Sequence, residues 1–390
     1  MNVQNHAVVC GRRIDFFCHN TEPEWGYAED QTDSFALIYP RNYDENIAYP
    51  LDVVFHSAGH DLFSTVRCTM TEGDHDIYHT PDDMFSLILD CRANEKNDWW
   101  WGGINVHDES WDRARAGISP QPVERRCIAT VEHIIENYNI DTDRVYAVGN
   151  SMGGTGALGI ALCRGDLFAS IKVNVPAGTR HAAERCCLFG EIPDGFKIPD
   201  PPVVVDYSSQ TDMWSIEHER LYEGMKNRRY ALHGFWGPFG HENNDSEMKK
   251  YNDLIHSIPA RSLRKCDAYP VFTDATTDDV NPWADPDHAP ECGQVNGFFH
   301  WETLTDTKDE LTMRLWLLRA DEWETRVTLP TESEAAVLIR RVQNFKLDGG
   351  ESFKWTFGDV SGIGKADADG HPDIGRVKIT QDAQILKITK

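Results

Sequence analysis

Short apolar runs alternate with longer amphipathic stretches over the first two thirds of the chain, from Ile14 to about Ser257. This alternation is typical of a mostly parallel β-sheet flanked by helices. We predict strands over Ile14–Cys18, Phe35–Tyr39, Leu51–His56, Phe85–Asp90, Arg144–Val148, Ile171–Val175, Val203–Tyr207 and Tyr230–His233. We predict helices over Gln121–Tyr138, Gly153–Cys163 and Ile216–Lys226. The first part of the chain is therefore expected to be an α/β domain.

The pattern changes after Cys266. The segment from there to Cys292 is rich in Pro, Asp and Thr, which indicates a linker or a long loop. Short runs without helical periodicity then alternate with turn residues. We predict strands over Gly297–Glu302, Met313–Leu318, Arg326–Leu329, Ala335–Val342, Phe353–Phe357, Arg376–Thr380 and Gln384–Thr389. This spacing is typical of a β-sandwich of the immunoglobulin or fibronectin type. We therefore divide the chain into an α/β domain over 1–262, a linker over 263–295 and a smaller β-sandwich over 296–390.

Length and charge exclude several classes of protein. The chain has 390 residues, more than one compact core usually holds, so two domains are expected. It carries 38 Lys and Arg against 63 Asp and Glu, which gives a net charge of −25. A nucleic-acid binder needs cationic side chains against phosphates, and binding to anionic lipid needs a basic patch. No run of eighteen apolar residues is present either. We expect neither a nucleic-acid partner nor a membrane.

The cysteines and the N-terminal residues bear on compartment. The ten cysteines show no CxxC pair, so the spacing predicts neither a zinc site nor a redox pair. The start, Met1 to Asn20, has no apolar region ahead of a small-residue cleavage site. We expect a cytoplasmic protein, or a secreted or periplasmic one if a signal peptide has been removed. Disulfide pairing and a homo-oligomeric state are left open.

The segment from Arg144 to Gly154 carries the strongest chemical signal. An apolar strand runs directly into Gly149-Asn-Ser151-Met-Gly153, a G-x-S-x-G pentapeptide, and a helix of small residues follows. A sharp strand-to-helix turn presents a serine oxygen clear of the backbone, and the helix N-terminus favours developing negative charge. We therefore assign Ser151 as a catalytic nucleophile.

A serine nucleophile needs a histidine base and an acid, which should follow later strands. Asp212 follows the predicted strand Val203–Tyr207, and His241 lies in a Gly-Pro-rich loop after Tyr230–His233. We assign His241 as general base and then acid, and Asp212 as the residue that fixes the imidazole tautomer and stabilises its charge. The rival acids and histidines, less suited by their positions, are Asp206, Glu217, Glu242, His218 and His233.

Two backbone N–H groups are needed to stabilise the oxyanion of the tetrahedral intermediate. The N–H of Met152, directly after the nucleophile, is one of them. The second is expected from the loop after the third strand, which reads His-Ser-Ala-Gly-His from His56. We choose the N–H of Ala58, with Ser57 or Gly59 as close alternatives.

These motifs resemble those of α/β-hydrolase esterases of the feruloyl esterase and polyhydroxybutyrate depolymerase group. The resemblance rests on Ser151-Met-Gly-Gly, on Asp212 in Gln-Thr-Asp-x-Trp and on His241 in Gly-Pro-Phe-Gly-His, and it covers roughly residues 1–260. It implies an α/β-hydrolase fold and secreted or polysaccharide-linked ester hydrolysis through an acyl-serine intermediate, without a cofactor. The loop sequence His-Ser-Ala-Gly departs from the His-Gly-x that is usual in the group.

Tryptophan is abundant, with twelve in the chain. Three follow Asp98 directly, and Trp111 comes ten residues after the third of them, all between the fourth strand and the long helix. This segment could wall the site for a sugar or an aromatic acyl group, or it could be a small core that holds a long loop. The four tryptophans that we predict as substrate contacts are Trp100, Trp101, Trp214 and Trp236.

Two acidic segments resemble metal sites only weakly. Asp74-His-Asp-Ile-Tyr-His79 has no further ligands at a fixed spacing, so a solvated acidic loop is the better interpretation. Asp367-Ala-Asp369-Gly370 lies between predicted strands and lacks the glutamate of an EF-hand loop, which favours a hairpin turn. We predict no metal and no cofactor.

The leading hypothesis is a serine carboxylic-ester hydrolase. It would remove an acetyl or feruloyl group from an acylated carbohydrate or a related small ester. The net charge of −25 makes a polyanionic substrate less suitable than a neutral acylated glycan. The alternatives are a serine peptidase with the same triad and a non-catalytic carbohydrate-binding protein, which the tryptophans and the β-sandwich would suit.

Overall fold

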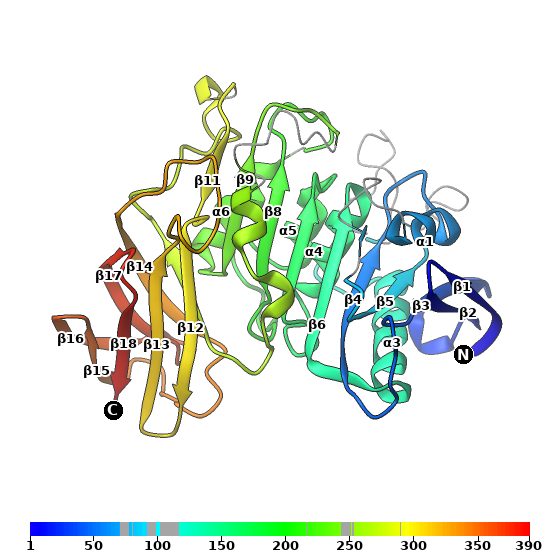
Figure 1. Ribbon diagram of the computed structural model, residues 1–390, viewed down its shortest axis with the longest axis horizontal. Helices are drawn as coiled ribbons and strands as arrows, with labels where there is room; N and C mark the ends of the chain where they lie inside the picture. The colour runs from blue at the N-terminus through cyan, green and yellow to red at the C-terminus, as the bar shows by residue number, and fades with distance from the viewer. Residues whose placement is uncertain are drawn as a thin grey trace.

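Two β-sheets lie side by side in the structure, a computed structural model (Figure 1). The structure describes residues 1–70, 78–79, 81–91, 99–101, 117–215, 217–242, 251, 253–288 and 290–390. A mostly parallel sheet with helices is followed by an all-β domain, so the predicted fold class is confirmed.

The first sheet has ten strands in the order β1-β2-β3-β5-β4-β6-β7-β8-β9-β11. Its strands are β1 (Asn2–Val9), β2 (Arg12–Asn20), β3 (Thr32–Ile38), β4 (Tyr49–Phe55), β5 (Phe85–Leu89), β6 (Ile140–Asn150), β7 (Ser170–Asn174), β8 (Val203–Ser208), β9 (Leu232–Trp236) and β11 (Gly293–Val295). The run from β5 to β9 is parallel, whereas β1, β2, β3 and β11 pair antiparallel. The carboxyl ends of the parallel strands therefore meet at one edge of the sheet.

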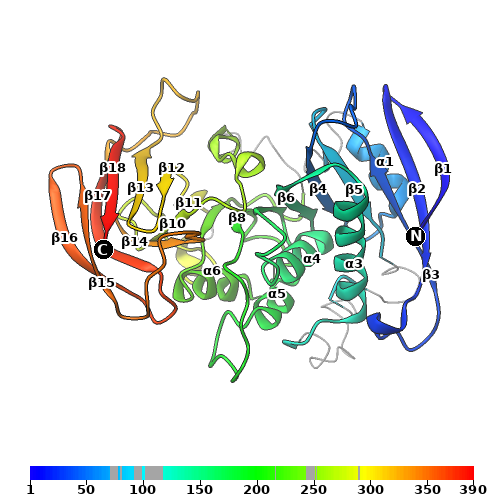
Figure 2. The ribbon, with the colours of Figure 1, turned by 90° about the horizontal axis from the view of Figure 1, so that it is seen from below.

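Helices cover both faces of this sheet. The α-helices are α1 (Leu62–Met70), α3 (Pro122–Asn137), α4 (Met152–Ala161), α5 (Thr179–Arg185) and α6 (His218–Asn227); the 3-10 helices are η1 (Pro23–Trp25), η4 (Ala260–Ser262) and η5 (Pro286–His288). Figure 2 shows α3 to α6 along one face and α1 on the other. Neighbouring strand residues alternate between the two layers: Val53 belongs to the core that contains α3 and α4 residues, and Val54 to the core that contains α1 residues. Among the described residues, no helix has the length and apolar character needed to cross a membrane.

The second sheet has eight strands in the order β10-β14-β17-β16-β15-β18-β13-β12. Its strands are β10 (Tyr269–Thr273), β12 (Phe299–Asp306), β13 (Glu310–Leu317), β14 (Glu332–Arg340), β15 (Ser352–Phe357), β16 (Val360–Ala366), β17 (Pro372–Thr380) and β18 (Gln384–Thr389). All its pairs are antiparallel, and the two edge strands β10 and β12 lie in contact, so the sheet is nearly closed. The domain is thus all-β as expected, but its strands form one curled sheet instead of two stacked ones. The predicted strand Arg326–Leu329 is not formed.

The segment 263–295, which we predict as a linker, contributes one strand to each sheet. β10 pairs with β14, and β11 pairs with β9. The Pro and Asp content of the segment does not predict these two short strands, because each is stabilised by its partner strand more than by local propensity. The two domains also share a core, in which Val205 and Phe235 from the first sheet lie with Phe299 from the second. The boundaries at 262 and 295 stay a prediction.

Candidate active site

The nucleophile lies at a tight turn between β6 and α4. Ser151 has φ 54° and ψ −122°, a strained conformation for a residue with a side chain. The surrounding backbone holds it there: its N–H donates to the Asn174 carbonyl at 2.9 Å, and its carbonyl accepts from the Ala177 N–H at 3.0 Å. Strand, turn and helix follow the order that the G-x-S-x-G motif predicts.

The two glycines of the motif are required by close backbone approaches. A Cβ at Gly149 would overlap the carbonyl oxygen of Gly153. A Cβ at Gly153 would overlap the carbonyl oxygen of Phe55, at the end of β4. The turn can therefore form against the neighbouring strand only because both positions lack a side chain.

The structure brings Ser151, His241 and Asp212 into one hydrogen-bonded chain. Ser151 Oγ lies 2.7 Å from His241 Nε2, and His241 Nδ1 lies 2.7 Å from Asp212 Oδ2. The Asp212 side chain is fully buried, whereas that of His241 is 30% exposed. Asp212 Oδ1 accepts a second hydrogen bond from the Trp214 N–H at 2.8 Å, which orients the carboxylate. This geometry lets a carboxylate fix the tautomer of a histidine that faces a serine hydroxyl.

The loop that carries His241 is held by the loop that carries Asp212. The N–H of Gly240 donates to Ser209 Oγ at 2.9 Å and to Thr211 Oγ1 at 3.0 Å. Gly240 has φ 73°, which glycine adopts without strain. The acid and the base therefore come from separate strands, β8 and β9, but their loops are tied together.

The rival residues lie in other surroundings. Asp206 is buried and accepts hydrogen bonds from Ser208 Oγ and Tyr222 Oη, with His218 Nε2 3.1 Å away. His233 is buried in β9, where burial lowers its pKa to about 4 despite its hydrogen bond with the Asn296 carbonyl. Of the two rival glutamates, Glu217 forms ion pairs with Arg180 and Arg220, and Glu242 is exposed.

The loop proposed for the second oxyanion donor is a turn after β4. The His60 N–H donates to the Ser57 carbonyl at 3.2 Å. The Ser57 N–H donates to the hydroxyl of Tyr78 at 2.7 Å, so it is already used and this alternative is removed. Ala58 and Gly59 remain exposed on the turn. Met152 opens helix α4, and the first N–H groups of a helix have no acceptor within it.

Trp100, Tyr78 and Asn150 hold this loop, and sequence reasoning missed the role of all three, although Asn150 lies within the G-x-S-x-G motif. Trp100 Nε1 donates to the His56 carbonyl at 3.0 Å. Ser57 Oγ lies 2.5 Å from Tyr78 Oη and accepts from Asn150 Nδ2 at 3.0 Å. Burial raises the pKa of Tyr78 well above its ordinary value, so its hydroxyl keeps its proton. No local pattern signals Tyr78, because its only relation to Ser57 is spatial.

The four predicted tryptophan contacts divide into two groups. Trp100 and Trp236 are each 1% exposed, so neither offers a face to a substrate and this prediction is corrected. The Trp100 ring packs edge-on against Phe55. The Trp236 ring packs against Tyr222 of α6 and against Trp283.

The side chains of the other two tryptophans are more exposed than those of Trp100 and Trp236. Trp101 is also largely buried and stacks on the ring of His181 at 4.4 Å. Trp214 is half-buried, and its ring centre lies 6.2 Å from that of His241, which leaves it as the best-placed tryptophan beside the triad. Trp111 lies outside the described residues.

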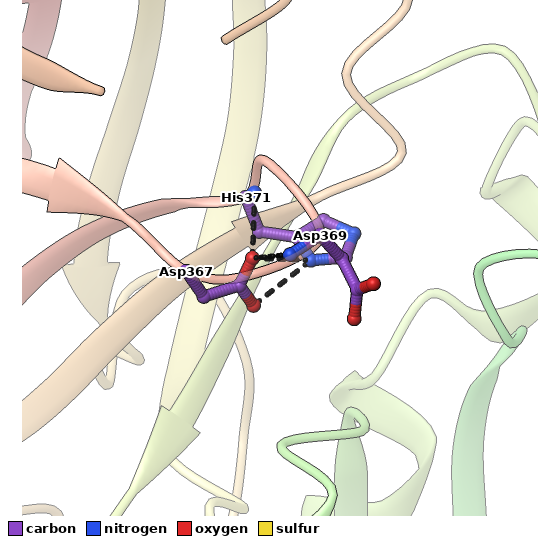
Figure 3. A group of neighbouring side chains, drawn as sticks. All are labelled: Asp367, Asp369 and His371. Atoms are coloured by element: carbon purple, nitrogen blue, oxygen red, sulfur yellow. Dashed lines mark hydrogen bonds and ion pairs between the residues drawn. The ribbon is translucent and has the colours of Figure 1, made fainter. Parts of the chain in front are cut away.

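One group of described residues has ligand atoms close enough to hold a metal ion: Asp367, Asp369 and His371, whose ligand atoms lie within 4.8 Å of one another. They lie in the hairpin turn between β16 and β17, as predicted for this segment (Figure 3). Both ring nitrogens of His371 already face carboxylates, Nδ1 at 3.0 Å from Asp367 Oδ2 and Nε2 at 2.9 Å from Asp200 Oδ1. This arrangement fits an ion-pair cluster better than a metal centre. Asp74, His75 and Asp76 lie outside the described residues.

Comparison with known proteins agrees with this geometry. Residues 128–282, which include Ser151, Asp212 and His241, match the esterase family described as "Putative esterase". None of the curated proteins matches the chain.

Solved structures with a similar arrangement include three hydrolases. An S-formylglutathione hydrolase from Agrobacterium tumefaciens is 16% identical with a TM-score of 0.42, over 62% of this chain and 93% of that one. A CE1 ferulic acid esterase from Anaeromyces mucronatus is 16% identical with a TM-score of 0.40, over 65% and 96%. The Bacillus cereus carboxylesterase is 14% identical with a TM-score of 0.39, over 55% and 90%. Likeness at this level says nothing about the substrate. The match to the esterase family thus covers residues 128–282, less than half of the chain, within a domain that has the α/β-hydrolase fold.

Proposed function

We propose that this chain is a serine carboxylic-ester hydrolase that removes an acyl group, acetyl or feruloyl, from a carbohydrate or a related natural ester. The observation that carries the proposal is the pair of 2.7 Å contacts that link Ser151 through His241 to Asp212. A serine hydroxyl that faces an oriented imidazole is suited to acyl transfer.

In the acylation step, Ser151 Oγ attacks the ester carbonyl carbon while His241 Nε2 takes the hydroxyl proton. The imidazolium that forms donates from Nδ1 to the buried Asp212 carboxylate, which stabilises its charge. The N–H groups of Met152 and Ala58 hold the oxyanion. His241 then passes its proton to the leaving alcohol, and the acyl group remains on Ser151.

In the deacylation step, a water molecule replaces the alcohol. His241 takes a proton from the water as it attacks the acyl carbon, and returns it to Ser151 Oγ when the carboxylic acid leaves. No cofactor enters either step. The half-buried Trp214, whose ring centre lies 6.2 Å from that of His241, provides an apolar surface next to the triad.

The first test is the pair Ser151→Ala and Ser361→Ala. Ser361 is an exposed serine of β16 and serves as the matched control. We expect Ser151→Ala to lose both fluorophosphonate labelling and hydrolysis of p-nitrophenyl acetate, by about 10⁴-fold or more, with an unchanged melting temperature. Full turnover in folded Ser151→Ala protein would refute the assignment.

The second test separates the ester class from the alternatives. The panel would hold acetylated, feruloylated and methyl-esterified polysaccharides, p-nitrophenyl esters, peptide anilides and the thioester S-formylglutathione. Release of acetate or ferulate at the highest kcat/KM supports the proposal. Preferred cleavage of the anilides would indicate a peptidase, and glycan binding without turnover of any substrate would indicate a carbohydrate-binding protein.

A further inference from the structure

Trp283 lies in the segment 274–292, which joins β10 of the second sheet to β11 of the first and is called the interdomain segment below. Its backbone N–H donates to Asn281 Oδ1 at 3.1 Å. The Asn281 carbonyl accepts the N–H groups of Ala284 and Asp285, so Trp283 sits in a hydrogen-bonded turn. Its indole ring is partly buried and packs against the core of the first domain.

The Trp283 ring contacts the two elements that adjoin the triad loops. It stacks on the ring of His218, the first residue of α6, with the ring centres 4.4 Å apart. It also lies edge-on to the ring of Trp236, the last residue of β9, with the centres 6.1 Å apart. The loop with Asp212 runs from β8 to α6, and the loop with His241 follows β9. The ring therefore lies against the end of one triad loop and the start of the other.

The indole N–H of Trp283 binds the Asp212 loop directly. Trp283 Nε1 donates to Ser215 Oγ at 3.1 Å. Ser215 Oγ lies 3.1 Å from the Ser209 carbonyl oxygen and 3.3 Å from that of Asp212, both within reach of its hydroxyl proton. A serine hydroxyl has a single proton and an indole N–H can only donate, so the indole directs that proton toward these carbonyls. A chain of hydrogen bonds thus runs from the interdomain segment to the backbone around Asp212.

The same chain of hydrogen bonds reaches the loop of His241. Ser209, whose carbonyl faces Ser215 Oγ, accepts the N–H of Gly240 at its own Oγ, at 2.9 Å. Gly240 directly precedes His241. Ser209 and Ser215 are buried, with exposed fractions of 0% and 8%. Because water has little access to them, the loss of a protein donor at this place is not readily compensated.

The interdomain segment is joined to the Asp212 loop at a second point. Gln210, two residues before Asp212, donates from Nε2 to the carbonyl of Glu291 at 2.8 Å. Two residues further along the chain, β11 begins and pairs antiparallel with β9, with Gly293 opposite Trp236. The segment is therefore fixed to the first domain on the C-terminal side of Trp283, which limits how far the indole can move from Ser215.

We propose that Trp283 is a positioning residue for the triad. Its indole N–H, acting through Ser215 Oγ, holds the backbone around Asp212, and the Asp212 carboxylate orients the imidazole of His241. The inference rests on the proposed function, because it gives Trp283 a role in that same site. The segment that joins the two domains is then part of the catalytic framework. A displacement of about 1 Å at a catalytic group can cost about 10²-fold in rate, so a single distant hydrogen bond can matter.

A double-mutant cycle on the full chain, with p-nitrophenyl acetate as substrate, tests the proposal. Trp283→Phe keeps a ring against His218 but removes the N–H, and Ser215→Ala removes its acceptor. We expect each variant to lower kcat roughly tenfold and to change KM by less than about twofold. The double variant should be no slower than either single one, because both remove the same interaction. The matched control Trp316→Phe removes an indole N–H that donates to Glu322 in the second domain and should behave as the parent does.

Proton NMR gives a second readout, which requires no turnover. The downfield resonance of the proton between His241 Nδ1 and Asp212 Oδ2 reports how the imidazole is held, and its absence in His241→Gln identifies it. We expect this resonance to shift or broaden in Trp283→Phe and in Ser215→Ala, and to stay unchanged in Trp316→Phe. Circular dichroism verifies that each variant is folded.

The outcomes that overturn the proposal are distinct from those that overturn the proposed function. Additive losses of kcat in the double variant would show that Trp283 acts by packing alone. A parent-like kcat or an unchanged resonance in Trp283→Phe would also overturn the proposal, and if that variant does not fold, the same result in Ser215→Ala decides. If the parent hydrolyses no ester and a fluorophosphonate does not label Ser151, the proposed function fails, and the resonance alone decides the role of Trp283.

Discussion

His241 and His371 each have an aspartate beside Nδ1, and they differ in what faces Nε2. In the candidate active site, His241 Nε2 faces the hydroxyl of Ser151 at 2.7 Å. In the β16–β17 hairpin, His371 Nε2 faces a second carboxylate, that of Asp200 in the first domain, at 2.9 Å. The first histidine has a partner whose proton it can take, and the second is held between two anions.

The charge environment of His371 favours its protonated form by raising its pKa. Burial lowers its pKa, but its hydrogen bond to Asp200 and the attraction of Asp200 and Asp367 outweigh burial and raise the pKa above 6.5. Arg340 lies 2.6 Å from the same Asp200 carboxylate and completes an interdomain cluster. A histidine–aspartate pair is therefore not by itself a catalytic feature; the group at the second nitrogen decides its role.

The largest expected effect on activity comes from replacing His241, with the same replacement at His371 as the comparison. His241→Gln should lower kcat/KM for p-nitrophenyl acetate by at least about 10⁴-fold, because no base then faces Ser151. His371→Gln should leave kcat/KM close to that of the parent. Both are measured by steady-state kinetics, with circular dichroism to verify folding. An active His241→Gln enzyme would break the comparison.

A smaller effect on activity is expected from the residue that holds the oxyanion loop. Tyr78→Phe leaves the Ser57 N–H without its acceptor, so the loop should shift, and kcat should fall roughly 10–100-fold with little change in KM. Tyr146→Phe is the matched control, since it removes a buried tyrosine hydroxyl that donates to the Leu263 carbonyl instead. Equal kcat in the two variants would show that Tyr78 has no positioning role.

The interdomain cluster should contribute to stability in a pH-dependent way. Because the folded-state pKa of His371 is raised, its stabilisation is fully present below pH 6.5 and is lost as the pH rises through the folded-state value. His371→Gln should cost about 1–3 kcal/mol of unfolding free energy at pH 6 and much less at pH 9. Urea titrations at both pH values measure this. An equal cost at pH 6 and pH 9 would contradict an imidazolium at this position.

The smallest effect is expected from metal ions. Both His371 nitrogens already face carboxylates, so a divalent cation would have to displace Asp200 or Asp367. We expect EDTA, zinc chloride and calcium chloride each to shift the melting temperature by less than about 1 °C, as measured by scanning calorimetry. A large upward shift with zinc or calcium, abolished in His371→Gln, would instead identify a metal centre there.

Much of the site could be predicted because its parts are encoded locally. Gly149 and Gly153 around Ser151 specify a strand–turn–helix, and the apolar runs of β8 and β9 set the loops of Asp212 and His241 at one edge of the sheet. The carboxyl ends of neighbouring parallel strands share that edge whatever else the chain does. The strand β1, the helices α1 and α5, and the strands β10, β11 and β16 were not predicted, because they are short or depend on a partner.

The tryptophans show where sequence reasoning fails. Trp100 and Trp236 look like ligand platforms in a sequence, since an aromatic residue next to a catalytic loop has the same pattern whether it is exposed or buried. The structure buries both, and Trp100 supports the oxyanion loop through His56. Burial depends on residues distant in sequence, and no local pattern carries that information.

The sequence by itself determined the fold class, the nucleophile elbow at Ser151 and the order of acid and base along the chain, because periodicity, turn residues and motif spacing are local properties. Only the tertiary structure decided that the Ser57 N–H donates to Tyr78, and which histidine faces a serine and which faces a second carboxylate. These features arise from contacts between segments far apart in the chain, whose geometry is set by packing.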